Sequence, residues 1–270
     1  MDWLWPEDQR GIPTDDRGLA YGHGLFETIR VTLHGPVLEG RHRDRLLKGC
    51  QALGIPFCAQ AFAQWHQSAA ARHLLDGTDR VLKLTVTAGS GGRGYRAPDP
   101  VVPRVITASR PAPCVPDGAV NVRSCRHPVQ VAPGCGGLKT LGRIDQVLAS
   151  DELSSSDFEG LMFDASGFAV EGTRTNLFVL RGDRVVTPPR ETLAVSGTLR
   201  DWLAEALPAL GYGFTEQPLT RQLILEHGLL LGNSVMGLVS ANLLDDVGLT
   251  VSDPARTLQQ TIATRLGLSR

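Results

Sequence analysis

The sequence predicts an α+β protein built from two mixed α/β domains, residues 1–115 and 116–270. In the first half, segments with the alternating apolar pattern of strands take turns with segments that have the apolar period of helices. Prolines near the middle of the chain mark a linker between the domains: Pro111, Pro113 and Pro116. The second half instead begins with a helix and continues with two hairpins. With 270 residues, of which 42% are hydrophobic, the chain can form a core in each domain.

The elements expected in the first half follow from the spacing of apolar residues. A strand is predicted over residues 26–33. A helix is predicted before the stop signal Gly54, because apolar residues recur there at helical spacing: Leu46, Leu47, Cys50 and Leu53. Further expected elements are a helix over 60–75 and strands over 81–88, 101–109 and 119–123. One face of the strand at 81–88 should be buried, and it carries Leu82, Leu84, Val86 and Ala88.

The second half is expected to combine amphipathic helices with tight hairpins. A first helix contains Ile144, Val147 and Leu148, and a last helix extends over about 254–266. Hairpins are predicted between these helices, at two turn sequences that occupy residues 164–167 and 181–184. A longer helix, ending at Gly211, is predicted from its apolar residues: Leu199, Trp202, Leu203, Ala206, Leu207 and Leu210.

The composition excludes several classes of function. The formal net charge is −1 and the basic residues form no block, so we expect no nucleic-acid partner. No apolar run is long enough to span a bilayer and the N-terminus lacks the pattern of a signal peptide, so we expect no membrane partner. The five cysteines and seven histidines show no spacing of metal ligands or redox pairs, and a reducing cytoplasm is the expected compartment.

Residues 89–94 read Gly-Ser-Gly-Gly-Arg-Gly and match the G-x-G-x-x-G pattern of dinucleotide-binding proteins. That fingerprint requires a helix to begin at the loop, because the helix N-terminus binds the pyrophosphate. Here Pro98 and Pro100 follow within a few residues and prevent a helix, which excludes a dinucleotide site. Two interpretations of the segment stay open. It is either a plain glycine-rich turn or a loop that lets Arg93 approach a bound anion.

Only three lysines occur in the chain, so a nucleophilic lysine would have to be Lys48, Lys83 or Lys139. The first two have ordinary polar surroundings. Lys139 lies in Gly-Cys-Gly-Gly-Leu-Lys-Thr, which fails as a P-loop because Leu138 separates the lysine from the last glycine. Small and apolar neighbours can favour an uncharged, nucleophilic amine. A surface lysine at the start of a helix is the alternative.

Two further segments carry residues that suit a ligand site. Glu171 ends a predicted hairpin strand and precedes glycine and small hydroxyl residues, which fits either a ligand site or a solvated turn. Ser196 is the expected N-cap of the long helix that follows Gly197 and Thr198. Amides at such a helix start can bind phosphate, and a plain cap is the alternative.

The order and spacing of several segments resemble the fold type IV pyridoxal-phosphate enzymes, the superfamily of the class IV aminotransferases. The similarity extends from about Asp16 to Val239, nearly the whole chain. Its segments are DRGLAYGHGLFETIR over 16–30, HRDRL over 42–46, GLKTLGRIDQ over 137–146, EGTRTNLF over 171–178, and two glycine turns at 197–200 and 232–234.

The resemblance implies the D-amino-acid-aminotransferase type of fold and pyridoxal 5'-phosphate as cofactor. It assigns Lys139 to the Schiff base with the cofactor, Arg45 to the cofactor phosphate and Glu171 to the pyridine nitrogen. It places further cofactor contacts in the two glycine turns, on the phosphate side: Gly197, Thr198, Asn233 and Ser234. It also implies a homodimer, because dimers are the habit of this superfamily.

Two stretches are typical of one branch of the superfamily, the aminodeoxychorismate lyases. They are GSGGRGY over 89–95 and the pattern around Lys139, which continues to Leu148. The resemblance implies an elimination that releases pyruvate and 4-aminobenzoate for folate biosynthesis. The small-molecule substrate has two carboxylates, and Arg93 and Tyr95 are the residues expected to bind it.

The chain departs from the superfamily pattern at a few positions. His23 stands where aspartate is usual, Gly142 replaces an asparagine, Ala88 replaces an arginine, and residues 238–240 replace a more proline-rich end. These departures bear on the substrate, so a branched-chain or D-amino-acid transaminase on the same scaffold is the nearer alternative. A non-catalytic or nucleotide-binding protein is the more distant one.

Overall fold

The structure is a computed structural model that describes all residues except 6, 7, 9, 74–77, 132, 133, 269 and 270. The chain forms two compact units. The first contains Met1–Ala112 and the short segment Leu138–Gly142, and the second contains Pro113–Gly137 and Arg143–Arg270. Lys139 therefore belongs to the first unit, although the chain before and after its segment belongs to the second. Among the described residues, none of the helices combines the length and the apolar character that crossing a membrane requires.

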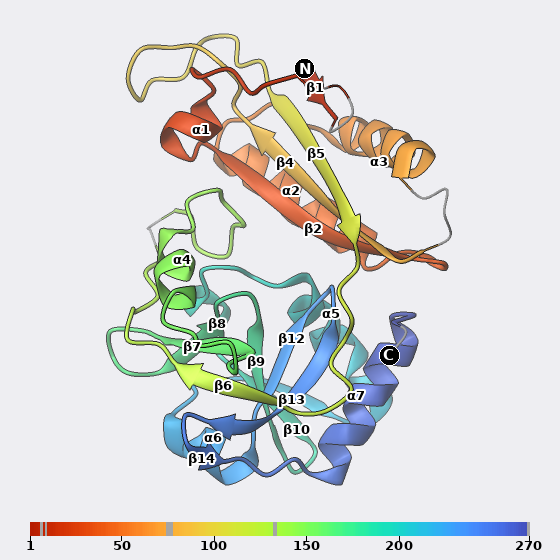
Figure 1. The fold of residues 1–270 in the computed structure, drawn as a ribbon, viewed down its shortest axis with the longest axis vertical. Coiled ribbons are helices and arrows are strands. Elements are labelled where there is room, and N and C mark those ends of the chain that lie inside the picture. The colour runs from red at the N-terminus through yellow and green to blue at the C-terminus, as the bar shows by residue number, and fades with distance from the viewer. Residues whose placement is uncertain (6–7, 9, 74–77, 132–133, 269–270) are drawn as a thin grey trace. The chain divides into compact units, whose positions relative to one another are not determined.

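The first unit contains a five-stranded sheet of order β1-β5-β4-β2-β3 (Figure 1). Strand β1 is parallel to β5, and the other neighbours are antiparallel. The strands are β1 (Asp2–Leu4), β2 (Gly24–Thr32), β3 (Gly35–Pro36), β4 (Arg80–Thr87) and β5 (Arg104–Pro111). The helices are α1 (Arg17–Tyr21), α2 (Glu39–Ala52) and α3 (Ala59–His73).

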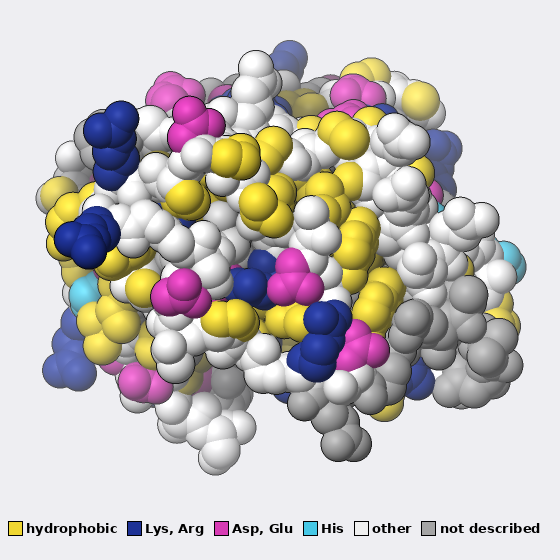
Figure 2. Space-filling model, turned by 90° about the horizontal axis from the view of Figure 1, so that it is seen from above, with side chains coloured by type: hydrophobic (Ala, Val, Ile, Leu, Met, Phe, Trp, Pro, Cys, Tyr) yellow, Lys and Arg dark blue, Asp and Glu magenta, His cyan; other side chains and the backbone are white. Residues whose placement is uncertain are grey.

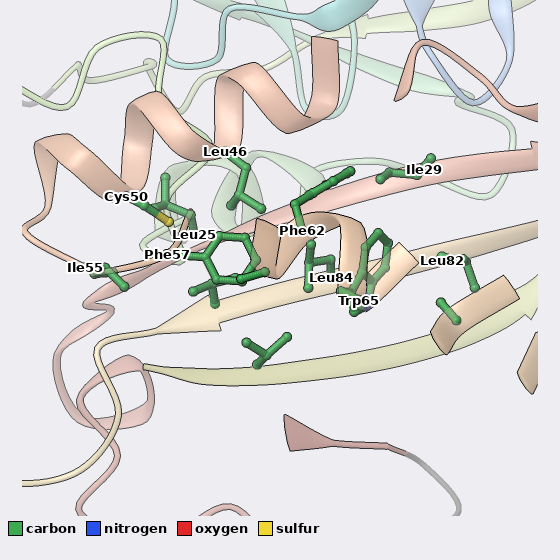
Figure 3. Packing of buried hydrophobic residues seen from close by; sticks show 14 of the residues in the cluster. Leu25, Ile29, Leu46, Cys50, Ile55, Phe57, Phe62, Trp65, Leu82 and Leu84 are labelled. Atoms are coloured by element: carbon green, nitrogen blue, oxygen red, sulfur yellow. The ribbon is translucent and has the colours of Figure 1, made fainter. Parts of the chain in front are cut away.

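The core of the first unit lies between this sheet and the helices α2 and α3 (Figure 3). Trp65 of α3 is fully buried, and its indole N–H donates to the Thr107 hydroxyl at 3.0 Å, which satisfies the polar atom of the ring. Gly49 lets α2 approach β2 closely, since a Cβ there would lie 2.3 Å from a methyl group of Leu25. Alternation along β2 places Glu27 on this same helix-facing side, and its carboxylate is fully buried.

The second unit contains a nine-stranded sheet of order β11-β10-β9-β12-β13-β6-β7-β8, with β14 paired to β13. The strands are β6 (Val120–Ser124), β7 (Glu159–Phe163), β8 (Ala169–Gly172), β9 (Asn176–Arg181), β10 (Arg184–Thr187), β11 (Gly213–Glu216), β12 (Leu230–Asn233), β13 (Gly237–Leu244) and β14 (Val247–Gly248). The α-helices are α4 (Ile144–Ser150), α5 (Thr198–Ala206), α6 (Arg221–His227) and α7 (Asp253–Arg265). Two 3₁₀ turns are η2 (Arg190–Thr192) and η3 (Pro208–Leu210).

A further pairing in this sheet joins β8 back to β9, with Glu171 opposite Asn176. Strands β9, β12, β13, β6, β7 and β8 therefore form a closed ring. Its interior is filled by apolar side chains, among them Leu161, Leu177 and Val239, which are all fully buried. Glu171 thus lies at the junction that closes the ring, where both neighbouring strands restrict its backbone.

The structure confirms most of the expected elements. Both hairpins form at the predicted turns, as β7–β8 and β9–β10. The expected buried face of β4 is confirmed, since its apolar side chains are 0% exposed. The predicted helix over 60–75 corresponds to α3, and its last two residues lie outside the described residues. The glycine-rich segment 89–94 is followed by turns and bends rather than a helix, as expected.

Three expectations need correction. The long helix after Thr198 is α-helical only to Ala206, because Pro208 has no N–H to continue the ladder, and a 3₁₀ turn carries it to Gly211. The apolar residues of α4 do not all face a core, since Ile144 is 65% exposed. The N-cap of α5 is Gly197 and not Ser196.

Candidate functional site

Arg45 of α2 is held by a buried carboxylate in the first unit. Its Nε donates to Glu27 Oε1 at 2.8 Å, and a second guanidinium nitrogen pairs with the other oxygen of the same carboxylate. His42, one turn earlier on α2, contacts Glu27 Oε2 through Nδ1 at 2.6 Å. Strand β2 thus supplies the anion, and one face of α2 supplies both partners. This geometry fixes the direction of the Arg45 side chain, of which 12% remains exposed.

The electrostatics of this cluster favour an ionised Glu27. Burial by itself would raise the pKa of Glu27, but the charge and hydrogen bonds of Arg45 and His42 outweigh it and lower the pKa to about 2. Burial also lowers the pKa of His42, although Glu27 opposes that shift. A carboxylate that stays charged is a permanent anchor for the Arg45 guanidinium.

The segment that contains Lys139 lies along the start of β2. The Phe26 amide donates to the Lys139 carbonyl at 2.9 Å, and the Leu141 amide donates to the Gly24 carbonyl at 3.0 Å. The Lys139 ammonium lies 4.5 Å from the centroid of the Phe26 ring. Lys139 is partly buried, whereas Lys48 and Lys83 are exposed. Burial therefore distinguishes Lys139 from the other two lysines.

Arg93 and Tyr95 lie in the loop that joins β4 to β5. Both side chains are exposed, Tyr95 to 88%. The Tyr95 ring contacts the Tyr21 ring of α1 in an edge-on arrangement, with centroids 5.4 Å apart. Several loop glycines have positive φ, including Gly91 at 105° and Gly94 at 60°, a backbone conformation that residues other than glycine rarely adopt. The loop therefore has a defined shape and presents two side chains able to bind an anion or an aromatic ring.

Glu171 is the central acidic residue of the second unit's candidate site. It is 3% exposed, and both of its oxygens accept hydrogen bonds. Gln146 of α4 donates to Oε1 at 3.1 Å, and the Val195 amide donates to Oε2 at 3.1 Å. Donors on both oxygens stabilise the ionised carboxylate. Such a buried anion is suited to stabilise a cationic group of a ligand.

The turn before α5 differs from the expectation that Ser196 is the N-cap. The Ser196 hydroxyl instead accepts a hydrogen bond from Arg190 at 2.7 Å and lies near Asp201. Gly197 is the N-cap, and it has no side chain with which to cap the helix. A Cβ at Gly197 would lie 1.8 Å from Asn176 Oδ1, so only glycine fits there. Thr198 follows as the first residue of α5 and is buried.

The second glycine turn, between β12 and β13, is shaped by Asn233. Its side-chain oxygen accepts from the amides of Val235 at 2.9 Å and Met236 at 3.0 Å, and its amide group donates to the Arg174 carbonyl at 3.3 Å. Ser234 lies within this turn and is 7% exposed. Asn233 therefore fixes the backbone around Ser234.

The predicted site residues fall into two groups, one in each unit. Arg45, Arg93, Tyr95 and Lys139 belong to the first unit. The second unit carries Glu171, Gly197, Thr198, Asn233 and Ser234. Among the described residues, no group of histidine, cysteine and acidic side chains is arranged to hold a metal ion.

Residue-by-residue reasoning missed two supporting residues. Glu27 was noted only as part of a resembling segment, although an acidic residue between Leu25 and Ile29 on the apolar side of a strand signals a buried ion pair. Gln146 carries no comparable signal, because its contact with Glu171 joins α4 to a distant strand.

Comparison with known proteins covers most of the chain. Residues 24–244 match the family described as amino-transferase class IV. An aminodeoxychorismate lyase from Vibrio harveyi is 30% identical over 220 residues, 78% of this chain and 79% of that protein. A putative branched-chain-amino-acid aminotransferase from Methanocaldococcus jannaschii is 29% identical over 219 residues, 79% of this chain and 75% of that protein. The crystal structure of a 4-amino-4-deoxychorismate lyase from Pseudomonas aeruginosa aligns with a TM-score of 0.88 and 34% identity, covering 95% of this chain and 96% of that one.

Proposed function

This chain belongs to the class IV amino-transferase family, and on that basis we propose that it is a pyridoxal-phosphate-dependent 4-amino-4-deoxychorismate lyase. The observation that carries the proposal is the 34% identity to a lyase of known structure along nearly the full length of both chains. The lyase motif GSGGRGY lies in a loop of defined shape, between β4 and β5. The products would be pyruvate and 4-aminobenzoate, a precursor in folate biosynthesis.

The residues present fit pyridoxal phosphate. The cofactor needs an amine for attachment, and Lys139 is the partly buried one of the three lysines. It needs an anion beside its pyridine nitrogen, and Glu171 is a buried carboxylate with donors on both oxygens. When bound, the cofactor supplies an electron sink for the charge left on a carbon that loses a proton.

We assign the cofactor contacts as follows. Lys139 attaches the cofactor, and Glu171 keeps the pyridine nitrogen protonated through its negative charge. Arg45, oriented by Glu27, binds the phosphate by charge-assisted hydrogen bonds. We assign two glycine turns to the cofactor phosphate as well, through backbone amides and small side chains: Gly197, Thr198, Asn233 and Ser234. Gly197 supports this role, because it has no side chain that could cover the turn before α5.

The elimination requires a base and no second substrate. The Lys139 amine would accept the proton from the amine-bearing ring carbon of the substrate. The carbon–oxygen bond to the enolpyruvyl group then breaks, and the released enol takes up a proton to become pyruvate. The remaining ring is aromatic 4-aminobenzoate, so the atoms balance without water or an amino acceptor. Aromatisation makes the step strongly favourable.

Arg93 and Tyr95 are our candidates for binding the substrate. The planar guanidinium of Arg93 can bind a carboxylate through two parallel hydrogen bonds. We expect Arg93→Lys to raise KM for aminodeoxychorismate about tenfold or more, since lysine keeps the charge but loses the paired geometry. Arg96→Lys in the same exposed loop is the matched control and should leave KM unchanged. An unchanged KM in Arg93→Lys would remove Arg93 from the substrate site.

A direct assay tests the function itself. One reaction contains aminodeoxychorismate, and parallel reactions contain branched-chain or D-amino acids with 2-oxoglutarate. We expect pyruvate and 4-aminobenzoate from the first reaction and at most slight turnover in the others. The second candidate function is transamination, favoured by the 29% identity to the putative branched-chain enzyme. Turnover in the transamination reactions alone would replace the lyase assignment with that candidate.

We also propose that the protein is a cytoplasmic homodimer. Helix α4 leaves Ile144, Val147 and Leu148 between 43% and 65% exposed, and contact with a second copy would remove these apolar side chains from water. Light scattering after gel filtration should give twice the mass of the chain. Val147→Glu is expected to weaken the dimer, and Val102→Glu, at an equally exposed valine, is the control. If Val147→Glu forms a dimer as stable as that of the native protein, helix α4 does not lie in the interface.

A further inference from the structure

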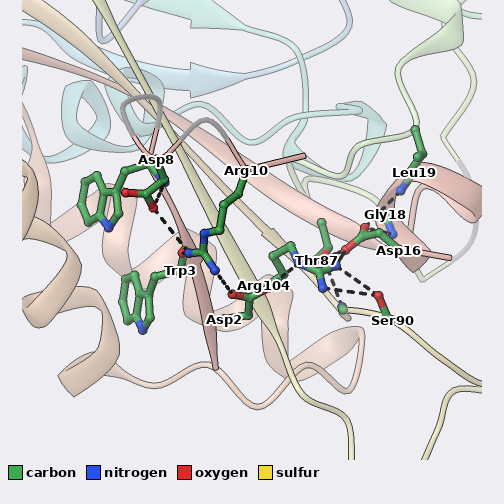
Figure 4. A network of polar contacts seen from close by, with 12 residues as sticks. Asp2, Trp3, Asp8, Arg10, Asp16, Gly18, Leu19, Thr87, Ser90 and Arg104 are labelled. Atoms are coloured by element: carbon green, nitrogen blue, oxygen red, sulfur yellow. Dashed lines mark hydrogen bonds and ion pairs between the residues drawn. The ribbon is translucent and has the colours of Figure 1, made fainter. Parts of the chain in front are cut away.

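The loop between β4 and β5 is anchored at its base by a buried ionic network (Figure 4). Asp16 is fully buried, and its carboxylate accepts hydrogen bonds from the Thr87 hydroxyl at 2.9 Å and from the Arg104 guanidinium. Arg104 also donates to Asp2 at 2.8 Å and to the Ser90 hydroxyl at 3.3 Å. Because Thr87 ends β4 and Arg104 begins β5, one carboxylate joins the two ends of the loop.

The tip of the same loop closes around a second buried arginine, Arg17 of α1. Arg17 is 2% exposed. Its Nη2 donates to the Tyr95 carbonyl at 2.6 Å, and its Nη1 lies 3.3 Å from the carbonyl oxygens of Gly91, Gly94 and Arg96. Four backbone carbonyl oxygens of one short segment therefore surround a single guanidinium.

The Nε–H of this guanidinium meets His23. Arg17 Nε donates to His23 Nδ1 at 3.3 Å, and His23 Nε2 donates to the Leu53 carbonyl at 2.9 Å. A carbonyl can only accept, so Nε2 of His23 is the donor to Leu53 and Nδ1 is the acceptor from Arg17. His23 thus supplies an acceptor for Arg17 Nε.

Two further contacts connect Arg17 to the exposed side of the loop. The Arg17 guanidinium carbon lies 5.0 Å from the centroid of the Tyr21 ring, which in turn contacts the Tyr95 ring. Gly92 has a φ of 82°, and a Cβ there would lie 2.5 Å from the Arg96 carbonyl oxygen and 3.1 Å from Arg17 Nη1. The loop glycines thus permit the backbone to close around the guanidinium.

We propose that Arg17 is a positioning residue that holds this loop in the conformation that presents Arg93 and Tyr95 to the substrate, an inference that rests on the proposed function. A buried guanidinium loses its hydration and needs acceptors, and this loop conformation supplies four of them. Arginine has five N–H donors in a planar fork, which reach the carbonyls and His23 together. A lysine has three donors at one point and cannot replace that pattern.

The test compares Arg17→Lys and Arg17→Ala with the native holoenzyme. Amide hydrogen exchange is measured for the loop and, as an internal reference, for the strands β2 and β4. Limited trypsin digestion reports on the same loop, because trypsin cleaves after exposed Arg93 and Arg96. The control is Arg43→Ala, at an exposed arginine of α2 that pairs with Asp44.

In both Arg17 variants, amide hydrogen exchange in the loop and tryptic cleavage of the loop should increase about tenfold or more. The reason is that opening of the loop no longer breaks the charge-assisted hydrogen bonds of the Arg17 guanidinium. The strands should keep native protection, and Arg43→Ala should behave as native. Guanidinium added at millimolar concentration, far below the molar range that unfolds proteins, should restore loop protection in Arg17→Ala. Restoration would separate the loss of one cation from general damage to the fold. If Arg17→Ala does not fold, Arg17→Lys alone decides the comparison.

Kinetics provides the link to the substrate. Arg17→Lys should raise KM for aminodeoxychorismate by a factor similar to that of Arg93→Lys, while the absorbance and affinity of the bound cofactor stay native. Either of two results for Arg17→Lys would overturn the positioning role. One is native protection of the loop amides from hydrogen exchange, and the other is a loosened loop with a native KM. If the lyase assay fails for the native protein while the Arg17 variants still loosen the loop, the proposed function is wrong and the loop contact stands.

Discussion

Replacing Glu27 with glutamine tests the buried cluster on β2 and α2. The variant keeps the shape of the side chain but removes the negative charge that binds Arg45 and His42. In the native protein these partners outweigh burial and lower the pKa of Glu27 from 4.5 to about 2. A depressed pKa stabilises the folded state above the unfolded value, and this stability is lost as the pH falls through the folded value. The window of the effect therefore extends from pH 4.5 down to about 2.

The magnitude follows from the size of the shift. One pKa unit corresponds to about 1.4 kcal/mol, so this shift contributes on the order of 3 kcal/mol to the free energy of unfolding at neutral pH. Glu27→Gln should be destabilised by a similar amount near pH 7, because Arg45 also loses its buried partner. The difference between the two proteins should narrow by about 1.4 kcal/mol for each pH unit below 4.5.

Urea unfolding at a series of pH values measures this difference. Tryptophan fluorescence is a suitable signal, because Trp3, Trp5 and Trp65 lie in the first unit with Glu27. The control is Glu39→Gln on the same helix, whose carboxylate is 38% exposed and pairs with His66, so little change is expected. Parallel pH profiles for the native protein and Glu27→Gln would refute the reasoning, since they would show that Glu27 releases its proton alike in the folded and unfolded states.

Three further predictions concern the proposed cofactor contacts. Borohydride reduction and peptide mapping should place the cofactor label on the peptide with Lys139, and label on Lys48 or Lys83 would contradict the assignment. Glu171→Gln should fold and bind the cofactor but turn over far more slowly, because an amide cannot stabilise the protonated ring; near-native turnover in a steady-state assay would argue against that role. Arg45→Ala should weaken cofactor affinity about tenfold or more, from the loss of roughly 1.5–3 kcal/mol, and titration of the cofactor-free protein measures it. Native affinity would show that Arg45 does not bind the phosphate.

One face of the molecule carries charges of both signs. On the face drawn in Figure 2, basic and acidic side chains lie interspersed among apolar ones.

Local features of the fold could be predicted from the sequence. The buried face of β4 follows from alternation of apolar residues, and the two hairpins follow from turn sequences of a few residues. The exclusion of a dinucleotide site is also local, because Pro98 and Pro100 prevent a helix wherever the loop lies. The scarcity of lysines limits a nucleophilic lysine to Lys48, Lys83 or Lys139, and the neighbours of Lys139 leave a surface lysine open as the alternative.

Other features depend on residues that are far apart in the chain. Ser196 is a good N-cap by type, but Arg190 and Asp201 engage its hydroxyl, and the packing of Asn176 against Gly197 sets the cap one residue later. The burial of Arg17 could not be predicted, because its acceptors come from a loop more than 70 residues away along the chain.

The sequence by itself therefore determined most of the elements and the turns, because periodicity and turn chemistry act over a few residues. Only the tertiary structure decided that the Lys139 segment joins the first unit, through backbone hydrogen bonds to Gly24 and Phe26 of β2. It also decided that Glu27 directs Arg45 and that Gln146 directs Glu171. These pairs form because the chain's topology brings distant buried polar groups together, and each such group needs a partner once it loses water.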